Sequence, residues 1–189
     1  MTLPLHVKER AAAVKLLVLD VDGVLTDGSL SYGPEGELTK TFHVRDGFGI
    51  RLLLQEGIEV AIISAKDSAP LRARLADLRI GRIFLGREDK LAAFAELLGQ
   101  VGVDASDVAY VGDDILDLPV MRLVGLPITV CDGHPFVRAE ATWVTEAAGG
   151  RGAVREVADG LLEARGRLRA ACDSLTGGAG PRRSRKDGS

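Results

Sequence analysis

Short apolar runs recur along the chain, and segments with apolar residues at helical spacing lie between them. Because strands that alternate with helices form βαβ units, this order predicts an α/β domain with a doubly wound parallel sheet. The expected strands are 15–19, 59–63, 82–85, 108–111 and 127–130. The expected helices are 47–56, 68–77, 90–100, 115–124 and 153–169.

One segment breaks this alternation. Residues 29–42 alternate polar and apolar positions on both sides of Gly33-Pro34-Glu35-Gly36, a pattern typical of a β-hairpin. A hairpin that projects from an α/β core exposes its edges, and proteins usually cover or pair such edges. The hairpin therefore bears on the oligomeric state of the protein.

The length of 189 residues fits one domain, because a domain holds roughly 100–200 residues. The sequence contains no internal repeat and no second apolar core, so we expect a single domain over residues 1–172. After Arg169 the helical pattern gives way to Gly, Ser and basic residues. Residues 173–189 are therefore expected to form a disordered basic tail.

Composition narrows the partners and the location. A formal net charge of −3 argues against general nucleic-acid binding, which needs a clustered basic face. The chain has two cysteines, Cys131 and Cys172, and their wide separation suggests neither a disulfide framework nor a zinc site. Residues 1–10 carry charges and a proline where a signal peptide needs an apolar segment. No run approaches the ~20 apolar residues of a membrane span, so we expect a cytoplasmic protein that binds no membrane.

Two carboxylates follow the expected strand 15–19, in the run Asp20-Val21-Asp22-Gly23-Val24-Leu25-Thr26. Side chains alternate along a strand, so Asp20 and Asp22 are expected to point the same way. Two like charges this close repel unless a cation joins them or one is protonated, and Gly23 lets the backbone turn just beyond them. The arrangement is typical of a nucleophile beside an acid. The alternative is an acidic pair in an ordinary strand-to-helix turn.

A second acidic cluster, Asp113, Asp114 and Asp117, follows the expected strand 108–111. Ligands of open parallel sheets bind at the carboxyl ends of the strands, so both clusters belong at one crevice. Five carboxylates there need a counter-charge, and an all-oxygen site suits Mg²⁺, which also bridges to substrate phosphate. The sequence therefore favours metal-assisted phosphoryl chemistry. A solvated acidic loop is the alternative for Asp114 and Asp117.

A hydroxyl and an ammonium group complete the candidate set. Ser64 follows the expected strand 59–63 and can donate to a phosphate oxygen, or it can cap the next helix. Lys90 begins the expected helix 90–100, where a cation is unfavourable against the helix dipole by about 0.3–1 kcal/mol. A nearby anion would remove that cost. A solvated surface lysine is the alternative.

These motifs, in this order, resemble the four motifs of the haloacid dehalogenase superfamily. Within it, roughly residues 14–165 resemble the small capless 3-deoxy-D-manno-octulosonate 8-phosphate phosphatases. The segments that carry this likeness are 42–50, 108–114 and 149–156. The family usually has Thr-Gly-Arg where this chain has Ser64-Ala65-Lys66, so a point charge replaces a bidentate fork.

The resemblance implies a Rossmann-like fold without a cap and hydrolysis through an aspartyl phosphate. Asp20 is then the nucleophile, and Asp22 acts first as an acid and later as a base. Ser64 and Lys90 orient the phosphoryl oxygens, and Asp117 orients Lys90. The implied Mg²⁺ ligands are Asp20, the backbone carbonyl of Asp22, Asp113 and Asp114, the last either directly or through a water.

The resemblance also implies a substrate and an assembly. The substrate is a small sugar-acid phosphate of lipopolysaccharide biosynthesis, and the residues implied to bind it are Thr26, Arg45, Asp46, Lys66 and Arg151. In the family the hairpins assemble a homotetramer, and the segment equivalent to 149–152 reaches an adjacent active site. Simpler interpretations remain: Thr26 satisfies a turn, Asp46 caps a helix, Arg45 forms a salt bridge, and Lys66 and Arg151 are solvated.

Three other functions compete with this interpretation. A phosphatase for a nine-carbon nonulosonate 9-phosphate is the nearest, and the Ser64-Ala65-Lys66 departure supports it. A response-regulator receiver domain also combines carboxylates, a hydroxyl and a lysine, but its phosphoacceptor lies on a middle strand, and Ile62-Ile63-Ser64 offers none. A catalytically silent tetramerisation module is opposed by the presence of Asp20, Asp22, Lys90 and Asp113 together.

Overall fold

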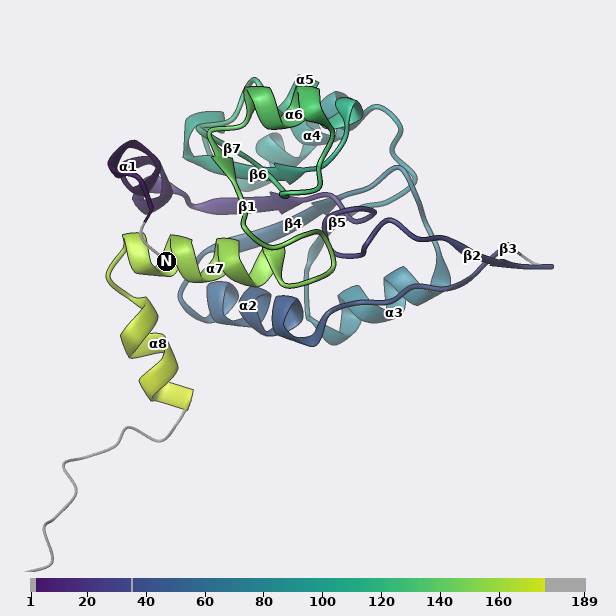
Figure 1. The fold of residues 1–189 in the computed structure, drawn as a ribbon, viewed down its shortest axis with the longest axis horizontal. Helices are drawn as coiled ribbons and strands as arrows, with labels where there is room; N and C mark the ends of the chain where they lie inside the picture. Colours follow the sequence, from purple (N-terminus) through teal and green to yellow (C-terminus); the bar gives the residue numbers. More distant parts are fainter. Residues whose placement is uncertain (1–2, 35, 176–189) are drawn as a thin grey trace, which may run out of the picture.

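A six-stranded parallel sheet forms the centre of the molecule in the computed structural model, which describes residues 3–34 and 36–175. The strand order is β5-β4-β1-β6-β7-β8, with helices on both faces of the sheet (Figure 1). The strands of the sheet are β1 (Leu16–Leu19), β4 (Glu59–Ile63), β5 (Arg82–Phe84), β6 (Val108–Gly112), β7 (Leu126–Thr129) and β8 (Trp143–Val144). The predicted α/β, doubly wound parallel architecture is confirmed.

The two faces of the sheet have separate cores. Every residue of β1 is buried; Leu17 and Leu19 pack into one core and Leu16 and Val18 into the other. A strand covered on both faces reads as a continuous apolar run, which is why the pattern of this strand identified it from sequence. The first core is covered by α1 (Leu5–Ala13), α2 (Val44–Gln55), α3 (Ala69–Asp77) and α7 (Ala153–Ala164), and the second by α4 (Lys90–Val101), α5 (Leu118–Met121) and α6 (Pro135–Glu140).

The predicted hairpin is present and lies outside both cores. Strands β2 (Ser31–Gly33) and β3 (Gly36–Thr39) pair antiparallel and form a separate two-stranded sheet that extends away from the body of the domain (Figure 1). Leu30, Tyr32 and Leu38 are exposed on it. The hairpin thus carries apolar side chains into solvent in the single chain.

The ends of the chain differ from the sequence prediction. Helix α1 and the two-residue strand β8 were not predicted, because neither has a long periodic pattern. The predicted helix 153–169 is interrupted: α7 ends at Ala164, Gly166 has a φ of 65°, and α8 (Leu168–Leu175) follows. The predicted boundary between domain and tail at 172/173 falls inside α8, and residues 176–189 lie outside the described residues.

Two internal boundaries were also misplaced. Helix α2 begins at Val44, three residues before the predicted start, which puts Arg45 and Asp46 in its first turn. The predicted helix 115–124 is a 3₁₀ turn, η2 (Ile115–Asp117), followed by the single-turn helix α5. Another 3₁₀ turn, η1 (Ala105–Asp107), precedes β6.

Among the described residues, none of the helices has the length and apolar character needed to cross a membrane.

Candidate active site

Three neighbouring central strands end in the polar residues that the sequence singled out. Asp20 follows β1, Ser64 follows β4 and Asp113 follows β6, and β1 pairs with both of the other strands. Parallel strands place their carboxyl ends at one edge of the sheet, where ligands of open α/β sheets bind. The structure therefore brings these residues to one edge, as the sequence predicted.

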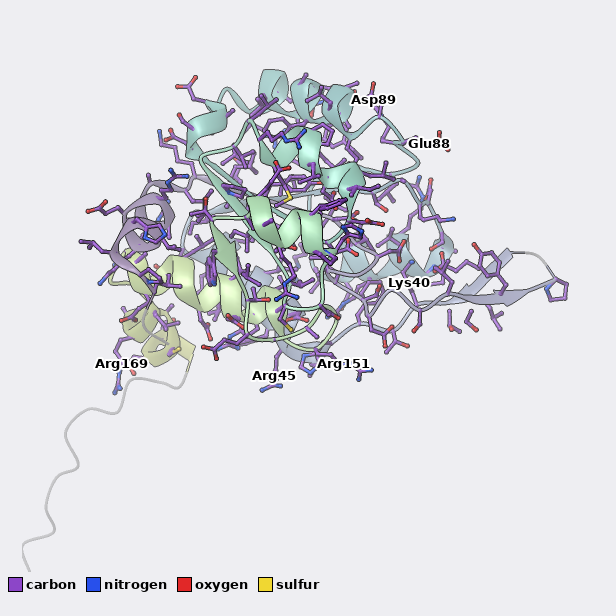
Figure 2. All side chains as sticks on the ribbon, turned by 45° about the horizontal axis from the view of Figure 1, so that its top comes forward. Lys40, Arg45, Glu88, Asp89, Arg151 and Arg169 are labelled. Atoms are coloured by element: carbon purple, nitrogen blue, oxygen red, sulfur yellow. The ribbon has the colours of Figure 1, made fainter. Side chains whose placement is uncertain are left out.

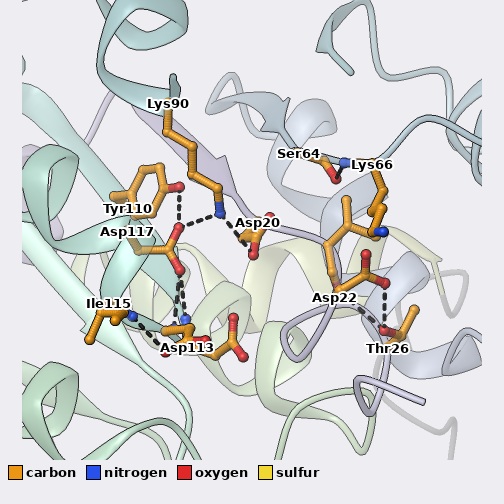
Figure 3. A network of polar contacts seen from close by, with 12 residues as sticks. Asp20, Asp22, Thr26, Ser64, Lys66, Lys90, Tyr110, Asp113, Ile115 and Asp117 are labelled. Atoms are coloured by element: carbon orange, nitrogen blue, oxygen red, sulfur yellow. Dashed lines mark hydrogen bonds and ion pairs between the residues drawn. The ribbon is translucent and has the colours of Figure 1, made fainter. Parts of the chain in front are cut away.

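Lys90 links the two acidic clusters. It is the first residue of α4, which Asp89 caps by accepting a hydrogen bond from the backbone N–H of Ala92 at 2.9 Å. The Lys90 Nζ lies 3.0 Å from Asp20 Oδ2 and 2.6 Å from Asp117 Oδ1, and its side chain is only 5% exposed (Figure 3). Burial alone would lower the pKa of Lys90, but the two carboxylates raise it above its ordinary value. The lysine is therefore a buried cation, and the predicted pairing with Asp117 is confirmed.

Both carboxylate oxygens of Asp117, the last residue of η2, accept hydrogen bonds. Its Oδ1 accepts hydrogen bonds from Lys90 and from the Tyr110 hydroxyl, the latter at 2.7 Å. Its Oδ2 accepts from the backbone N–H groups of Asp113 and Asp114 at 3.0 and 3.2 Å. With both oxygens occupied, Asp117 holds the lysine and the start of the acidic loop in place. Tyr110 was not among the residues predicted from the sequence, although a tyrosine in a buried strand needs a partner for its hydroxyl.

Asp113 and Asp20 are the carboxylates with excess negative charge. Burial, followed by repulsion from Asp20 and Asp117, raises the pKa of Asp113 to about 8, and its Oδ1 is buried without a hydrogen-bond partner. Burial, followed by repulsion from Asp117, raises the pKa of Asp20 to about 6 despite Lys90. Gly23, with a φ of 85°, leaves the space beside Asp113 that any side chain there would fill. The cluster is thus built with more negative charge than Lys90 neutralises.

The donor set fits a hard cation such as Mg²⁺. Asp20, Asp113 and Asp117 each offer an oxygen within 4.8 Å of the others. Because Asp117 already uses both oxygens, Asp20 and the unpartnered Asp113 are the side chains best placed as ligands. Asp114 is exposed, and its Oδ1 accepts from the backbone N–H of Ile115 at 2.7 Å, so its carboxylate caps η2.

Asp22 has partners different from those of Asp20. Strand β1 ends at Leu19, so the strand alternation used to orient both carboxylates does not extend through the following turn. Asp22 Oδ1 forms an ion pair with Lys40 Nζ and accepts a long 3.5 Å hydrogen bond from the Thr26 hydroxyl. Figure 3 shows Asp22 and Thr26 as a pair separate from the Lys90 network. Lys40 was not predicted from the sequence, because nothing in the hairpin pattern indicates that its side chain reaches Asp22.

The hydroxyl of Ser64 is buried at the end of β4, at the same edge of the sheet as Asp20 and Asp113. Its Oγ accepts a hydrogen bond from the backbone N–H of Lys66 at 3.1 Å, which leaves the hydroxyl proton to donate elsewhere. The Lys66 side chain is exposed beside it. The tripeptide Ser64-Ala65-Lys66 thus forms a turn that holds the hydroxyl at the end of β4.

Of the remaining predicted substrate residues, Asp46 and Arg151 have polar partners, and Arg45 lines a groove. Asp46 is buried and caps α7, because its oxygens accept the backbone N–H groups of Gly152 at 3.2 Å and Arg155 at 2.8 Å. Arg45 and Arg151 lie close together at the edge of the molecule (Figure 2), where both line a groove of about 610 Å³ along α7. Arg151 also pairs with Asp27, Nη2 to Oδ2, at 3.0 Å.

The loop before α7 packs on the turn after β1. The backbone N–H of Gly150 donates to the carbonyl of Val24 at 2.9 Å. A side chain at Gly149 or Gly150 would overlap the backbone of Gly23 or Thr26. Both glycines are therefore required by close approach, and they bring Arg151 beside the turn that carries Asp22.

Comparison with known proteins identifies the family. The chain is 50% identical over 163 residues to the 3-deoxy-D-manno-octulosonate 8-phosphate phosphatase of Salmonella typhi, and the match covers 86% of this chain and 87% of that protein. The chain belongs to the 3-deoxy-D-manno-octulosonate 8-phosphate phosphatase family. A family model for haloacid dehalogenase-like hydrolases matches residues 80–156. The family resemblance seen in the motifs, and with it the enzyme class, a phosphatase, is confirmed.

Solved structures of this family share the fold. The 3-deoxy-D-manno-octulosonate 8-phosphate phosphatase of Yersinia pestis superposes with a TM-score of 0.86 at 46% identity, covering 88% of this chain and 90% of that one. The enzyme of Moraxella catarrhalis, solved with a magnesium ion, a phosphate ion and KDO, gives a TM-score of 0.86 at 40% identity over 89% of this chain and 97% of that one. The Rossmann-like fold expected from the resemblance is therefore confirmed.

Proposed function

We propose that this chain hydrolyses 3-deoxy-D-manno-octulosonate 8-phosphate, with Mg²⁺ as cofactor, to the free sugar acid and inorganic phosphate. The observation that carries the proposal is the buried cluster at the carboxyl ends of β1 and β6, in which Lys90 pairs with Asp20 while Asp113 keeps an unpartnered oxygen. The names of the relatives and the magnesium, phosphate and KDO in the Moraxella catarrhalis structure support the substrate and the cofactor.

Asp20 supplies the nucleophile in the first step. A carboxylate oxygen of Asp20 forms a bond to phosphorus as the bond from phosphorus to the sugar oxygen breaks. Asp22, protonated, gives its proton to the departing sugar oxygen. Lys90 holds Asp20 by one oxygen, so the other oxygen is available for attack.

In the second step water attacks the phosphorus of the aspartyl phosphate. Asp22, now a carboxylate, takes the proton of that water, and the bond between phosphorus and Asp20 breaks to release phosphate and restore both side chains. Ser64 and Lys90 donate hydrogen bonds to the phosphoryl oxygens, where charge is spread in the transition state. Mg²⁺, held by Asp20, Asp113 and the backbone carbonyl of Asp22, with Asp114 as a further ligand directly or through a water, would neutralise the phosphoryl charge.

Substrate recognition is assigned to residues around this cluster. Thr26, Arg45, Lys66 and Arg151 are the proposed sugar-acid contacts. The exposed Lys66 beside Ser64 and the exposed Arg151 beside the turn after β1 offer positive charge to a carboxylate. Asp46, which caps α7, acts by positioning the loop that carries Arg151.

A nine-carbon nonulosonate 9-phosphate is the second candidate substrate. The observation that favours it is Lys66, which replaces the arginine usual in the family and changes the shape of the carboxylate contact. We assign the eight-carbon substrate first because the relatives at about half identity carry that name.

The proposed assembly is a homotetramer in the cytoplasm. The hairpin projects beyond the core and exposes Leu30, Tyr32 and Leu38, which a neighbouring subunit can cover. A domain without a cap leaves its crevice open, and a neighbouring subunit would limit access of water.

Phosphate release from a panel of sugar phosphates, with Mg²⁺ and with a chelator, tests this function. We expect Mg²⁺-dependent turnover with preference for the eight-carbon acid, and loss of turnover in Asp20→Asn. Lys66→Arg serves as a matched variant and is expected to keep the same preference. Preference for the nine-carbon acid that Lys66→Arg reverses would place specificity in this residue, and no turnover of any phosphomonoester would overturn the proposal.

A further inference from the structure

Lys40 is a buried lysine that none of the roles above uses. It follows β3, at the base of the hairpin (Figure 2), and its side chain is 0% exposed. Its Nζ contacts Asp22 Oδ1 and lies 2.8 Å from Glu37 Oε1. A buried ammonium group is stable only when it is paired, and the two carboxylates provide that pairing.

The two partners have different locations. Glu37 lies in β3 of the same hairpin, three residues before Lys40, and its side chain is only 9% exposed. Asp22 lies in the turn after β1, in the body of the domain. Lys40 therefore connects the hairpin to the turn that carries the proton-transferring carboxyl group.

The contact occupies one oxygen of Asp22 and leaves the other. Oδ1 pairs with Lys40 and accepts the weaker hydrogen bond from Thr26, whereas Oδ2 has no hydrogen-bond or ion-pair partner among the described residues. A carboxyl group held by one oxygen has a fixed orientation, and a protonated carboxyl can still accept at that oxygen while the proton is on the other. The geometry thus separates the oxygen that is held from the oxygen that transfers the proton.

We propose that Lys40 is a positioning residue for Asp22, holding Oδ1 so that Oδ2 delivers the proton to the leaving oxygen and later removes one from water. This inference rests on the proposed function, because it deepens the part played by Asp22. Glu37, in the hairpin, holds the ammonium group of Lys40 through a second ion pair.

The leaving group distinguishes positioning from a general structural role. An alkyl oxygen departs poorly without a proton, whereas 4-nitrophenolate departs without one. The value of kcat/KM reports on steps up to formation of the aspartyl phosphate, in which Asp22 acts as the acid. A misplaced Asp22 therefore lowers kcat/KM for alkyl phosphates and spares 4-nitrophenyl phosphate.

The experiment compares Lys40→Met with wild type on 3-deoxy-D-manno-octulosonate 8-phosphate and on 4-nitrophenyl phosphate. General acid catalysis contributes about 10²–10⁴-fold, so we expect a loss on the order of 10²-fold for the sugar phosphate and at most about threefold for the aryl ester. Lys40→Arg, which keeps the charge, is expected to recover much of the sugar-phosphate activity. Lys15→Met is the matched control, because Lys15 is exposed and pairs with Asp107 at the other end of the sheet. The ratio of its kcat/KM for the sugar phosphate to its kcat/KM for the aryl ester should equal the wild-type ratio.

A double-mutant comparison with Asp22→Asn completes the test. If Lys40 acts through Asp22, adding Lys40→Met to Asp22→Asn causes little further loss in kcat/KM for the sugar phosphate. Equal losses on both substrates, or a full additional loss in the double mutant, would overturn the inference. A wild-type enzyme without Mg²⁺-dependent turnover of either ester would instead overturn the proposed function, so the two failures are distinguishable. Lys40→Gln replaces Lys40→Met if the methionine variant does not fold.

Discussion

Lys90 is the buried cation on which the acidic cluster depends. It pairs with Asp20 and Asp117, while burial, followed by repulsion from both carboxylates, raises the pKa of Asp113 to about 8. Removing one partner of a buried ion pair leaves an uncompensated charge, which is strongly destabilising. The surplus of negative charge explains why these residue types, in this arrangement, suit a divalent cation.

Magnesium affinity should depend on pH because of Asp113. Burial and the neighbouring carboxylates raise the pKa of this group to about 8, so below that pH a cation must displace its proton. Affinity is therefore expected to rise with pH between about 6 and 8, by at most about tenfold per pH unit for one released proton. Titration calorimetry at several pH values measures it.

Two variants sharpen the magnesium measurement. Asp113→Asn is expected to remove both the tight binding and its pH dependence. Asp114→Asn is expected to weaken binding less, because the Asp114 carboxylate caps η2. Affinity that stays constant between pH 6 and 8 in the wild-type protein would contradict this account of Asp113.

Helix α7 is the element whose position controls the Arg151 loop. Asp46, in the first turn of α2, accepts two backbone N–H groups at the start of α7, and the helices α2 and α7 pack together. Gly149 and Gly150 then bring the loop against the turn after β1. The location of Arg151 thus follows from contacts between elements that are distant in sequence.

Replacing Asp46 tests this role. Asp46→Ala removes the acceptor for Gly152 and Arg155, and loss of a helix cap costs about 1–2 kcal/mol, or roughly 2–8 °C in Tm for a domain of this size. Asp46→Asn keeps one acceptor oxygen and should lose less. Thermal unfolding measures both variants. An unchanged Tm together with a raised KM would show that Asp46 contacts the substrate instead.

Sequence patterns predicted the central strands and helix α4 better than the short or weakly patterned elements. The central strands and the start of α4 were predictable, because buried parallel strands are short apolar runs and Lys90 begins a clear periodic pattern. The roles of Tyr110 and Lys40 depend on side chains that meet across the fold, so no local pattern contained them. Helix α1 and strand β8 are weakly patterned and were missed for that reason.

At the scale of the whole molecule, the hairpin is the feature that the single domain does not explain. Among the described residues, its strands pair with no strand of the central sheet, and it exposes apolar side chains. Lys40 anchors its base to Asp22, so a neighbouring subunit that holds the hairpin would also act on the active site. Oligomeric state and turnover are therefore expected to change together.

Charged substitutions on the hairpin test that coupling. Tyr32→Lys combined with Leu38→Lys should reduce the molar mass measured by light scattering from that of a tetramer and lower kcat/KM. Leu123→Lys is a matched control, because Leu123 is exposed after α5, away from the hairpin. A monomeric hairpin variant with undiminished activity would contradict the proposed contribution of the neighbouring subunit.

The most direct test of the account is the location of the phosphoryl group during turnover. Acid quenching of the enzyme with ³²P-labelled sugar phosphate, followed by peptide mapping, is predicted to place the label on Asp20 in wild-type protein and to find none in Asp20→Asn. Label on a histidine, or undiminished turnover by Asp20→Asn, would contradict hydrolysis through an aspartyl phosphate.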